Sequence, residues 1–441
     1  MAHSSSRRSF LKTTAATGVC VWAAGGIAPR ESRAANEKIQ FACIGVGGKG
    51  ASDSADAGQA GEVVAICDVD GDTLNKAAER FQSAEKFSDF REMLDKLGDK
   101  IDAVTVSTPD HTHAAAASMA MSMGKHCFCQ KPLTHSIFEA RRLGELAKEK
   151  GVQTQMGNQG TAENGVRRAA ALIKAGAIGS PKEVHVWTNR PVWPQGVVAT
   201  PAEAVPAMLN WDAFIGPAKF REYSSAYHPF KWRGFWDFGT GALGDMACHT
   251  MNMPYMGVDL KDPISVQATT AGHNKNTYPA YSVIRFEFPA NDWRGPVELY
   301  WYDGGKLPKP ELLSGATLGS NASGCLIVGD KGKLYSPNDY GAEFELIGGE
   351  DSAVKFQRSP GHFREFAMAI KGGPAPRSNF AEYAGPLTEV ILLGNLAVWA
   401  ADATDVEGPK VEWDAKNLKV IGTNKFDSIV KHEYREGWKL F

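Results

Sequence analysis

Short apolar runs alternate with segments of helical spacing through the first third of the chain. We predict strands over residues 39–45, 62–67, 101–107, 125–129 and 153–156. The helices between them are predicted to end near residue 60 and to span 73–81, 114–123 and 136–150. This alternation indicates an α/β fold with a parallel, doubly wound sheet. The unbroken apolar run 63–66 is typical of a strand that is covered on both faces.

The pattern changes after Gly157, where polar and apolar positions alternate along longer segments. Strands are predicted over residues 183–189, 264–270, 281–288, 297–302, 325–328 and 344–347, with a hairpin turn at 329–332. Helices are predicted over 164–174, 362–371 and 381–401, the last two packing back on the body. We therefore expect an α+β part whose large, open sheet is mostly antiparallel.

The first 35 residues have the pattern of a twin-arginine signal peptide. Ser6–Lys12 contains Arg7 and Arg8, a mild apolar stretch follows over 15–27, and small residues near Ala34 suit cleavage. The apolar stretch is too short and too rich in glycine for a stable membrane span, and no other segment approaches one. We expect an exported, periplasmic protein that folds before export. The alternative is a disordered basic tail.

Composition excludes several classes of partner. A formal net charge of -2 over 441 residues gives no reason to expect nucleic acid or an anionic membrane surface. Six cysteines follow the leader, and an even count in an exported protein permits disulfides. Because four of them lie in predicted central strands and their spacing fits no zinc pattern, we expect buried thiols. The histidines also lack metal-site spacing, so we predict no metal.

A glycine-rich turn joins the first predicted strand to the helix after it. Its six residues, Gly45, Val46, Gly47, Gly48, Lys49 and Gly50, form a G-x-G-x-x-G motif. Glycines at these positions let backbone N–H groups approach a pyrophosphate at the helix N-terminus. Asp68 ends the second strand, where an acid accepts from ribose hydroxyls and repels a 2′-phosphate. We therefore predict a nucleotide domain over 36–157 that binds NAD rather than NADP.

The segments 104–113 and 124–133 carry the most specific signal. The first runs V-T-V-S-T-P-D-H-T-H and the second G-K-H-C-F-C-Q-K-P-L. With an Ala-rich helix between them, they resemble the Gfo/Idh/MocA oxidoreductases, and the resemblance covers nearly the whole mature chain in element order. It implies a Rossmann domain, a substrate-binding and oligomerisation domain over 158–441, and a homo-oligomer. Further cofactor contacts implied by it are Thr108, Pro109, His113, Gln130 and Lys131. Asn158 follows the last predicted strand and is predicted to place an amide near the nicotinamide or substrate, and the alternative is a structural turn.

Lys131 is predicted to be catalytic on physical grounds as well. An ammonium beside a nicotinamide ring can polarise a substrate oxygen, or transfer a proton if desolvation lowers its pKa. The family usually has Glu where this chain has Gln130. Loss of that negative neighbour should ease deprotonation of Lys131 or loosen its position. In the family the peptide before Pro132 is often cis. The alternative is a surface lysine on a turn.

A second glycine-rich stretch, 239–249, ends in Asp245 and His249. The two lie four residues apart, on one face of a predicted helix. A carboxylate can orient a neutral imidazole, which can then take a hydroxyl proton. The family has D-x-x-x-H here, so we predict that both residues are catalytic. The alternative is a helix-capping Asp and a packed His.

The aromatic and basic stretch 227–238 lies just upstream of the predicted catalytic helix. Trp232, Arg233 and Trp236 are predicted to contact substrate together with Lys131 and His249, because aromatic faces and directed donors suit a sugar. Each aromatic taken singly is also ordinary core material.

Three functions fit this sequence. The first is an NAD-dependent oxidoreductase that acts on a secondary alcohol of a sugar, polyol or related carbohydrate. The second uses the same residues for redox-neutral glycoside hydrolysis, with transient oxidation and a cofactor that is never released. The third is a non-catalytic carbohydrate-binding or scaffold protein, against which the intact lysine and Asp/His pair argue.

Overall fold

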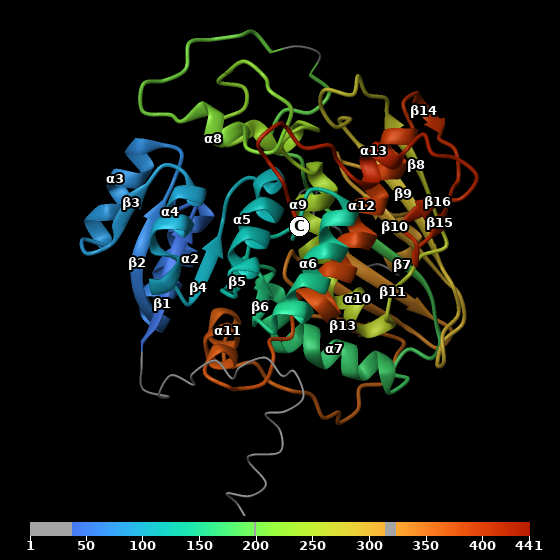
Figure 1. Cartoon of the computed structure of the whole chain (residues 1–441). Helices are drawn as coiled ribbons and strands as arrows, with labels where there is room; N and C mark the ends of the chain where they lie inside the picture. Colours follow the sequence, from blue (N-terminus) through green and yellow to red (C-terminus); the bar gives the residue numbers. More distant parts are fainter. Residues whose placement is uncertain (1–37, 198–199, 314–322) are drawn as a thin grey trace, which may run out of the picture. The chain divides into compact units, whose positions relative to one another are not determined.

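The first half forms a parallel sheet with the strand order β3-β2-β1-β4-β5-β6 (Figure 1). The computed structural model describes residues 38–197, 200–313 and 323–441, so the predicted leader with Cys20 lies outside the described residues. The strands are β1 Ile39–Ile44, β2 Gly61–Cys67, β3 Glu85–Phe87, β4 Ala103–Val106, β5 His126–Cys129 and β6 Thr154–Met156. The connecting helices are α2 Lys49–Ala60, α3 Gly71–Arg80, α4 Phe90–Leu97, the short η1 Gly98–Lys100, α5 Asp110–Ser122 and α6 Ile137–Lys150.

Alternate residues of β1 enter two different cores. Phe41 packs with Ala57 of α2, and Ala42 packs with residues of α4, α5 and α6 on the other face. Both β1 side chains have no exposed surface. The predicted doubly wound sheet, covered on both faces, is therefore confirmed. The short strand β3 and the helix α4 were not predicted, because β3 has three residues and none of them is fully buried.

The second half forms a ten-stranded sheet in the order β13-β12-β11-β7-β10-β9-β8-β15-β16, with β14 paired to β8. Among the described strands of this second sheet, only β7 and β10 pair in parallel. The predicted mostly antiparallel sheet is therefore confirmed. Its strands are β7 Pro181–Trp187, β8 Ser265–Ala271, β9 Ser282–Phe288, β10 Val297–Tyr302, β11 Gly324–Gly329, β12 Lys333–Pro337, β13 Glu345–Ile347, β14 Thr404–Glu407, β15 Val411–Asp414 and β16 Lys419–Val420. The last three strands were not predicted.

Helices cover one face of this sheet, as the alternating burial of β9 and β10 requires. Figure 1 shows α10 and α12 against the strands. The longer helices of this half are α7 Asn164–Lys174, α9 Gly241–Thr250, α10 Asn252–Val258, α11 His362–Ile370 and α12 Gly385–Ala400. The shorter ones are η2 Gln159–Ala162, α8 Trp211–Ile215, η3 Lys231–Gly234, η4 Pro310–Leu313, α13 Asp427–Val430 and the π-helical turn η5 Phe380–Ala384, which leads into α12.

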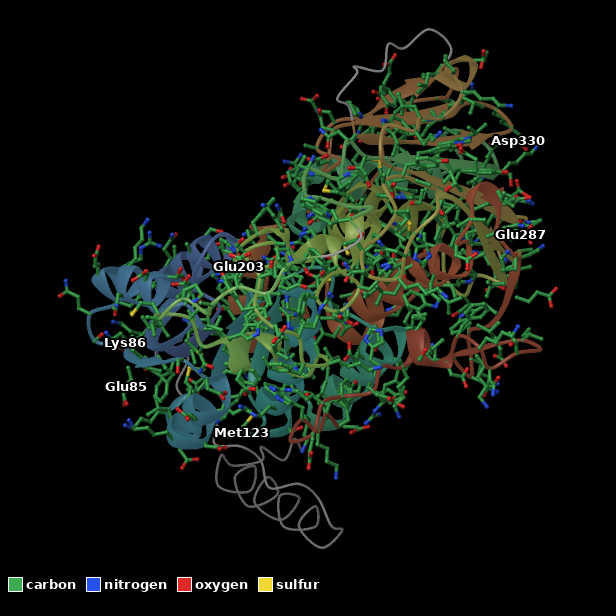
Figure 2. The ribbon with its side chains drawn as sticks, turned by 90° about the horizontal axis from the view of Figure 1, so that it is seen from above. Glu85, Lys86, Met123, Glu203, Glu287 and Asp330 are labelled. Carbon is green, nitrogen blue, oxygen red and sulfur yellow. The ribbon has the colours of Figure 1, made fainter. Side chains whose placement is uncertain are left out.

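The helix α11 packs back on the body, as predicted, and the part that it covers is the first sheet. Phe363 and Phe366 pack with Phe41 and Phe128, so α11 completes the core on the α2 side. Residues 39–441 form one compact unit, and the division at 157/158 stays a prediction. In Figure 2, Glu85 and Lys86 of β3 lie far from Glu287 and Asp330 of the large sheet, and Glu203 lies between them in that view.

The six cysteines after the leader are free and buried, as predicted. Burial raises the pKa of the Cys43 thiol to about 12 and raises that of Cys67 as well.

None of the described helices is long and apolar enough to cross a membrane. Within the same residues, no three His, Cys, Asp or Glu side chains are grouped as metal ligands would be.

Candidate active site

The glycine-rich turn between β1 and α2 leaves backbone bare along one wall of a cleft. Gly45 has a φ of 77°, and a Cβ there would lie 2.5 Å from the carbonyl oxygen of Ser107. A Cβ at Gly50 would lie 2.0 Å from the carbonyl oxygen of Gly45. Only glycine fits at either place. Gly45, Gly47, Gly48 and Lys49 line the cleft, so the N-terminus of α2 lies where a helix can bind an anion such as a dinucleotide pyrophosphate.

Asp68 lies beside this turn at the end of β2. Its carboxylate accepts hydrogen bonds from the backbone N–H groups of Val46 at 2.9 Å and Asp70 at 3.0 Å. Burial raises the pKa of Asp68, and these two bonds oppose the rise. The carboxylate is thus fixed against the glycine-rich turn, in the place where the ribose was predicted to bind.

Gln130 joins the turn to Lys131 through a buried carboxylate that the sequence did not reveal. Asp53, 1% exposed, accepts from Gln130 Nε2 at 2.9 Å, from Ser107 Oγ at 2.8 Å and from Lys49 Nζ at 2.6 Å. The side-chain carbonyl oxygen of Gln130 accepts a hydrogen bond from the Lys131 backbone N–H at 3.3 Å. A glutamate at 130 would face Asp53 with a second carboxylate. The amide is therefore the side chain that suits this neighbour.

Lys131 extends from β5 to Asp245 on α9. The distance from Nζ is 2.7 Å to Asp245 Oδ1 and 2.9 Å to the Asp245 carbonyl oxygen. The peptide between Lys131 and Pro132 is cis, as the family resemblance implied. His113 fixes this loop, because its ring nitrogens lie 2.8 Å from the carbonyl oxygens of Pro132 and Thr108. Thus two segments distant in sequence meet at one ion pair.

Asp245 is shared by two cations, since Arg233 Nε also lies 3.3 Å from Oδ1. Burial alone would raise the pKa of Asp245, but the charges of Lys131 and Arg233 outweigh it and lower the pKa well below its usual range. Asp110, 1% exposed, binds Arg233 Nη1 at 3.2 Å and Thr240 Oγ1 at 2.6 Å. The result is a row of alternating charges, Asp110–Arg233–Asp245–Lys131.

His249 lies one turn after Asp245 and is 4% exposed. Burial, followed by the charge of Lys131, lowers its pKa well below the usual value, so the ring is neutral at neutral pH. Its Nδ1 has no hydrogen-bond partner among the described residues. The His249 and Tyr340 rings meet edge to face, with their centroids 4.9 Å apart. We expected Asp245 to orient this imidazole. Instead the described contacts of the Asp245 carboxylate are with Lys131 and Arg233, because these two cations lie closer to it than the imidazole does.

Arg233 is held between two indole rings at the same end of the cleft. Its guanidinium carbon lies 4.3 Å from the ring centroid of Trp232 and 5.6 Å from that of Trp193. Trp236, predicted beside them, lies elsewhere. Its ring stacks on Tyr278 at 3.7 Å, and it lines a separate cavity. The short helix η3 thus presents Trp232 and Arg233 to the cleft and leaves Trp236 in the core.

One cleft of about 670 Å³ joins the glycine-rich turn to these groups. Of the predicted site residues, those that line it are Gly45, Gly47, Gly48, Lys49, Asp68, Thr108, Pro109, Gln130, Lys131, Trp232, Arg233, Asp245 and His249. Those that do not are Val46, Gly50, His113, Asn158 and Trp236. Asn158 is fully buried and accepts from Ser378 Oγ at 2.5 Å. Further lining residues include His228 and Phe230, which belong to the aromatic and basic stretch 227–238, and Gln159, which follows the predicted Asn158. Those that the sequence did not reveal include Asp110, Arg190, Tyr340 and Trp438.

Comparisons with curated proteins give partial matches to sugar and polyol dehydrogenases. The chain is 29% identical to the NADP(+) D-xylose 1-dehydrogenase of Haloarcula marismortui over 37% of this chain and 46% of that protein. It is 27% identical to the levoglucosan dehydrogenase of Pseudarthrobacter phenanthrenivorans over 43% and 40%. It is 29% identical to an inositol 2-dehydrogenase of Salmonella typhimurium over 28% and 37%. Each match covers less than half of the relative.

Solved structures share the fold over most of the chain. The WlbA dehydrogenase from Bordetella pertussis, in complex with NADH and UDP-GlcNAcA, superimposes with a TM-score of 0.60 at 19% identity. That match covers 86% of this chain and all of the other. A levoglucosan dehydrogenase in complex with NADH and L-sorbose gives a TM-score of 0.55 at 18% identity over 85% and 99%.

Two family models cover almost all the described residues. Residues 39–158 match the model of the oxidoreductase family's NAD-binding Rossmann fold. Residues 162–440 match the model of the family's C-terminal alpha/beta domain. The chain therefore belongs to the Gfo/Idh/MocA family of oxidoreductases, and its first half is the NAD-binding domain of that family.

Proposed function

We propose that this enzyme oxidises a secondary alcohol of a sugar, polyol or related carbohydrate with NAD. The observation that carries the proposal is the single cleft that runs from the glycine-rich turn to Lys131, Asp245 and His249. The matches to xylose, levoglucosan and inositol dehydrogenases support a carbohydrate substrate. Asp68 supports NAD over NADP, because its fixed carboxylate would repel a 2′-phosphate.

His249 is suited to receive the proton of the alcohol. NAD held by the glycine-rich turn and Asp68 would supply the hydride acceptor, and the oxidation also requires a base for the hydroxyl proton. The imidazole of His249 is neutral because burial lowers its pKa, so it can accept that proton. With Nδ1 lacking a partner among the described residues, substrate binding sets its orientation.

Lys131 is suited to hold the reacting oxygen. Two of its three N–H donors go to the Oδ1 atom and carbonyl oxygen of Asp245, which leaves the third for substrate. Asp245 stays ionised because Lys131 and Arg233 lower its pKa, so its carboxylate holds the Lys131 ammonium in place. Lys131 thus polarises the oxygen while His249 takes the proton.

The end of the cleft beyond Lys131 fits a sugar ring. Trp232 and Tyr340 supply aromatic surface, and Arg233 and Arg190 supply directed donors. Arg233 is already neutralised by Asp110 and Asp245, so a neutral polyol suits it better than an acid. This favours hydroxyl-rich, uncharged substrates.

A panel of sugars and polyols incubated with the protein and NAD tests the proposal. We expect net NADH and a keto product with at least one of them. Neither NADH nor a keto product from any of the panel, with NAD demonstrably bound, would count against it.

Redox-neutral glycoside hydrolysis is the second candidate, and a covering segment before α8 favours it. The Gly71 N–H bonds to the Met208 carbonyl at 2.8 Å, and the Asn210 N–H bonds to the Val69 carbonyl at 2.8 Å. His228 Nε2 lies 3.7 Å from Asp70 Oδ2 and lines the same cleft. These contacts fix the segment before α8 against the residues that follow Asp68. A segment fixed in this way suits a cofactor that is retained between turnovers.

Native mass spectrometry followed by a glycoside panel separates the two candidates. Retained nucleotide and released aglycone without net NADH would establish the second. Nucleotide that exchanges freely, with NADH accumulating, would establish the first.

We also propose export through the twin-arginine pathway and assembly as a homo-oligomer. The first rests on the sequence motif with Arg7 and Arg8, and the second on family resemblance and the half-buried outer face of β9 and β10. Replacing both arginines with lysine should leave unprocessed protein in the cytoplasm, and normal secretion of that variant would contradict the first proposal. Light scattering of the wild-type protein measures the second, and a monomer would contradict it.

A further inference from the structure

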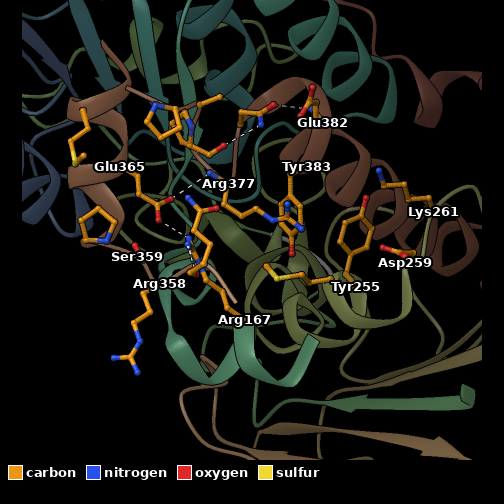
Figure 3. A pocket seen from close by; sticks show the side chains of 18 residues that line it. Arg167, Tyr255, Asp259, Lys261, Arg358, Ser359, Glu365, Arg377, Glu382 and Tyr383 are labelled. Atoms are coloured by element: carbon orange, nitrogen blue, oxygen red, sulfur yellow. Dashed lines mark hydrogen bonds and ion pairs between the residues drawn. The ribbon is translucent and has the colours of Figure 1, made fainter. Parts of the chain in front are cut away.

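A second cavity, of about 700 Å³, lies apart from the cleft and shares no lining residue with it. Its walls come from α7, α10, α11 and η5, with the loops 357–360 and 374–379 (Figure 3). The volume suits a small organic molecule. No step of the proposed reaction uses this cavity.

The floor of the cavity contains a neutralised ion pair. Arg167 is 6% exposed, and its Nη2 lies 2.6 Å from Glu365 Oε1. The remaining donors of Arg167 reach the carbonyl oxygens of Thr161 at 2.8 Å and Gln357 at 3.2 Å. Since each of these groups has its partner, the floor carries no excess charge.

Two cations at the same cavity have no such partner. Arg377 and Lys261 make no ion pair with the described residues, and the nearby Asp259 is already 2.9 Å from Lys174 Nζ. Glu382 is the one lining carboxylate without an ion pair among the described residues, and it is exposed. The cavity therefore has an excess of positive charge. Arg358 also lines it, but its side chain extends away from the others in Figure 3.

Aromatic groups fix the position of this charge. The guanidinium carbon of Arg377 lies 5.7 Å from the ring centroid of Tyr383. Tyr383 meets Tyr255 edge to face at 5.3 Å. Tyr255 is 2% exposed, and its hydroxyl has no hydrogen-bond partner among the described residues. A buried hydroxyl without a hydrogen bond costs free energy of folding.

We propose that this cavity is a binding site for a small organic anion. A carboxylate or phosphate group bonds to Arg377 and Lys261. A planar guanidinium fork matches either oxyanion. Met256 and Met368 give the body of the ligand apolar surface.

Calorimetric titration of the full chain saturated with NAD tests the proposal, because NAD then fills the other anion-binding region. The probes are inorganic phosphate, glucose 6-phosphate and glucuronate. We expect saturable binding that weakens at high salt. Arg377→Gln should raise the Kd at least about tenfold, because a charge-assisted bond is lost.

Two matched variants sharpen the result. Arg364→Gln removes an exposed arginine on α11 that does not line the cavity, and it should leave the Kd unchanged. Tyr255→Phe removes an inaccessible hydroxyl that has no described partner, so it should leave the Kd unchanged and should not lower the unfolding midpoint.

Binding of glucose 6-phosphate alone would identify the ligand as a phosphate ester, and binding of glucuronate as well would support the shared oxyanion chemistry. Absence of saturable binding by all three probes would overturn the proposal. So would a Kd that is equal in the wild type and in a folded Arg377→Gln protein.

Discussion

Asp245→Asn should cost both stability and turnover, because one carboxylate neutralises two nearly buried cations. Lys131 Nζ lies at 2.7 Å and Arg233 Nε at 3.3 Å from Oδ1, and the side chains of Lys131 and Asp245 are 15% and 10% exposed. Breaking a buried pair costs roughly 3–5 kcal/mol. Asparagine keeps an acceptor oxygen and Asp110 still neutralises Arg233, so we expect about 3 kcal/mol in urea unfolding. Turnover should fall less than in His249→Ala, because the imidazole remains.

The loss should depend on pH in one direction. The folded pKa of Asp245 lies below its unfolded value, so the carboxylate contributes stability above the unfolded pKa and loses it as the pH falls through the folded one. The difference in unfolding free energy between wild type and variant should therefore be constant from neutral pH down to about pH 5. It should narrow below about pH 4.

Asp237→Asn is the matched control. Asp237 also pairs with an arginine, Arg221, at 2.9 Å, but its side chain is 38% exposed. An exposed pair contributes about 0–1 kcal/mol. If Asp245→Asn destabilises the protein no more than Asp237→Asn does, the carboxylate is not the shared anchor of the two cations.

The remaining predictions address the reaction and the cofactor. His249→Ala and Lys131→Ala should each lose at least about 10² in turnover while the cofactor still binds, as a fluorescence titration with NADH can show. Near-normal turnover of both on a verified substrate would refute the site. Asp68→Ala should weaken NAD binding and reduce discrimination against NADP, and an unchanged preference would refute the role of Asp68. Gln130→Glu should lower the unfolding midpoint, and adding Asp53→Asn should restore it, because only one carboxylate is then present.

The elements that repeat a clear pattern could be predicted from the sequence. The apolar strands of the first sheet, the glycine-rich turn and the helix that carries Asp245 and His249 lie where expected. Parallel strands bring their carboxyl ends to one edge, which is why the turn and Lys131 share a cleft.

The partners of these residues could not be predicted. Asp53 lies on a polar stretch of α2 that has the composition of a solvent-exposed face, yet it is buried beneath Gln130. Tyr340 and Trp438 reach the cleft from loops about 290 and 390 residues after the glycine-rich turn, and no local pattern indicates such a return. Trp236 was placed at the substrate by the composition of its segment alone, and it lies after η3 Lys231–Gly234, where no helical or strand periodicity fixes the side-chain direction.

The return of α11 to the first sheet determines how this protein can be divided. Phe363 and Phe366 fill the core beside Phe41 and Phe128. A fragment that stops at residue 158 would therefore expose the rings of Phe41 and Phe128 to water. During synthesis the ribosome must release residue 370 before the NAD-binding half can close its core. The two halves are consecutive in sequence matches, but a gene fragment encoding only the first half should yield insoluble protein. Supplying residues 362–370 in trans or by fusion should cover the rings of Phe41 and Phe128 and raise the soluble fraction, but the face of α6 that packs against α12 would stay exposed.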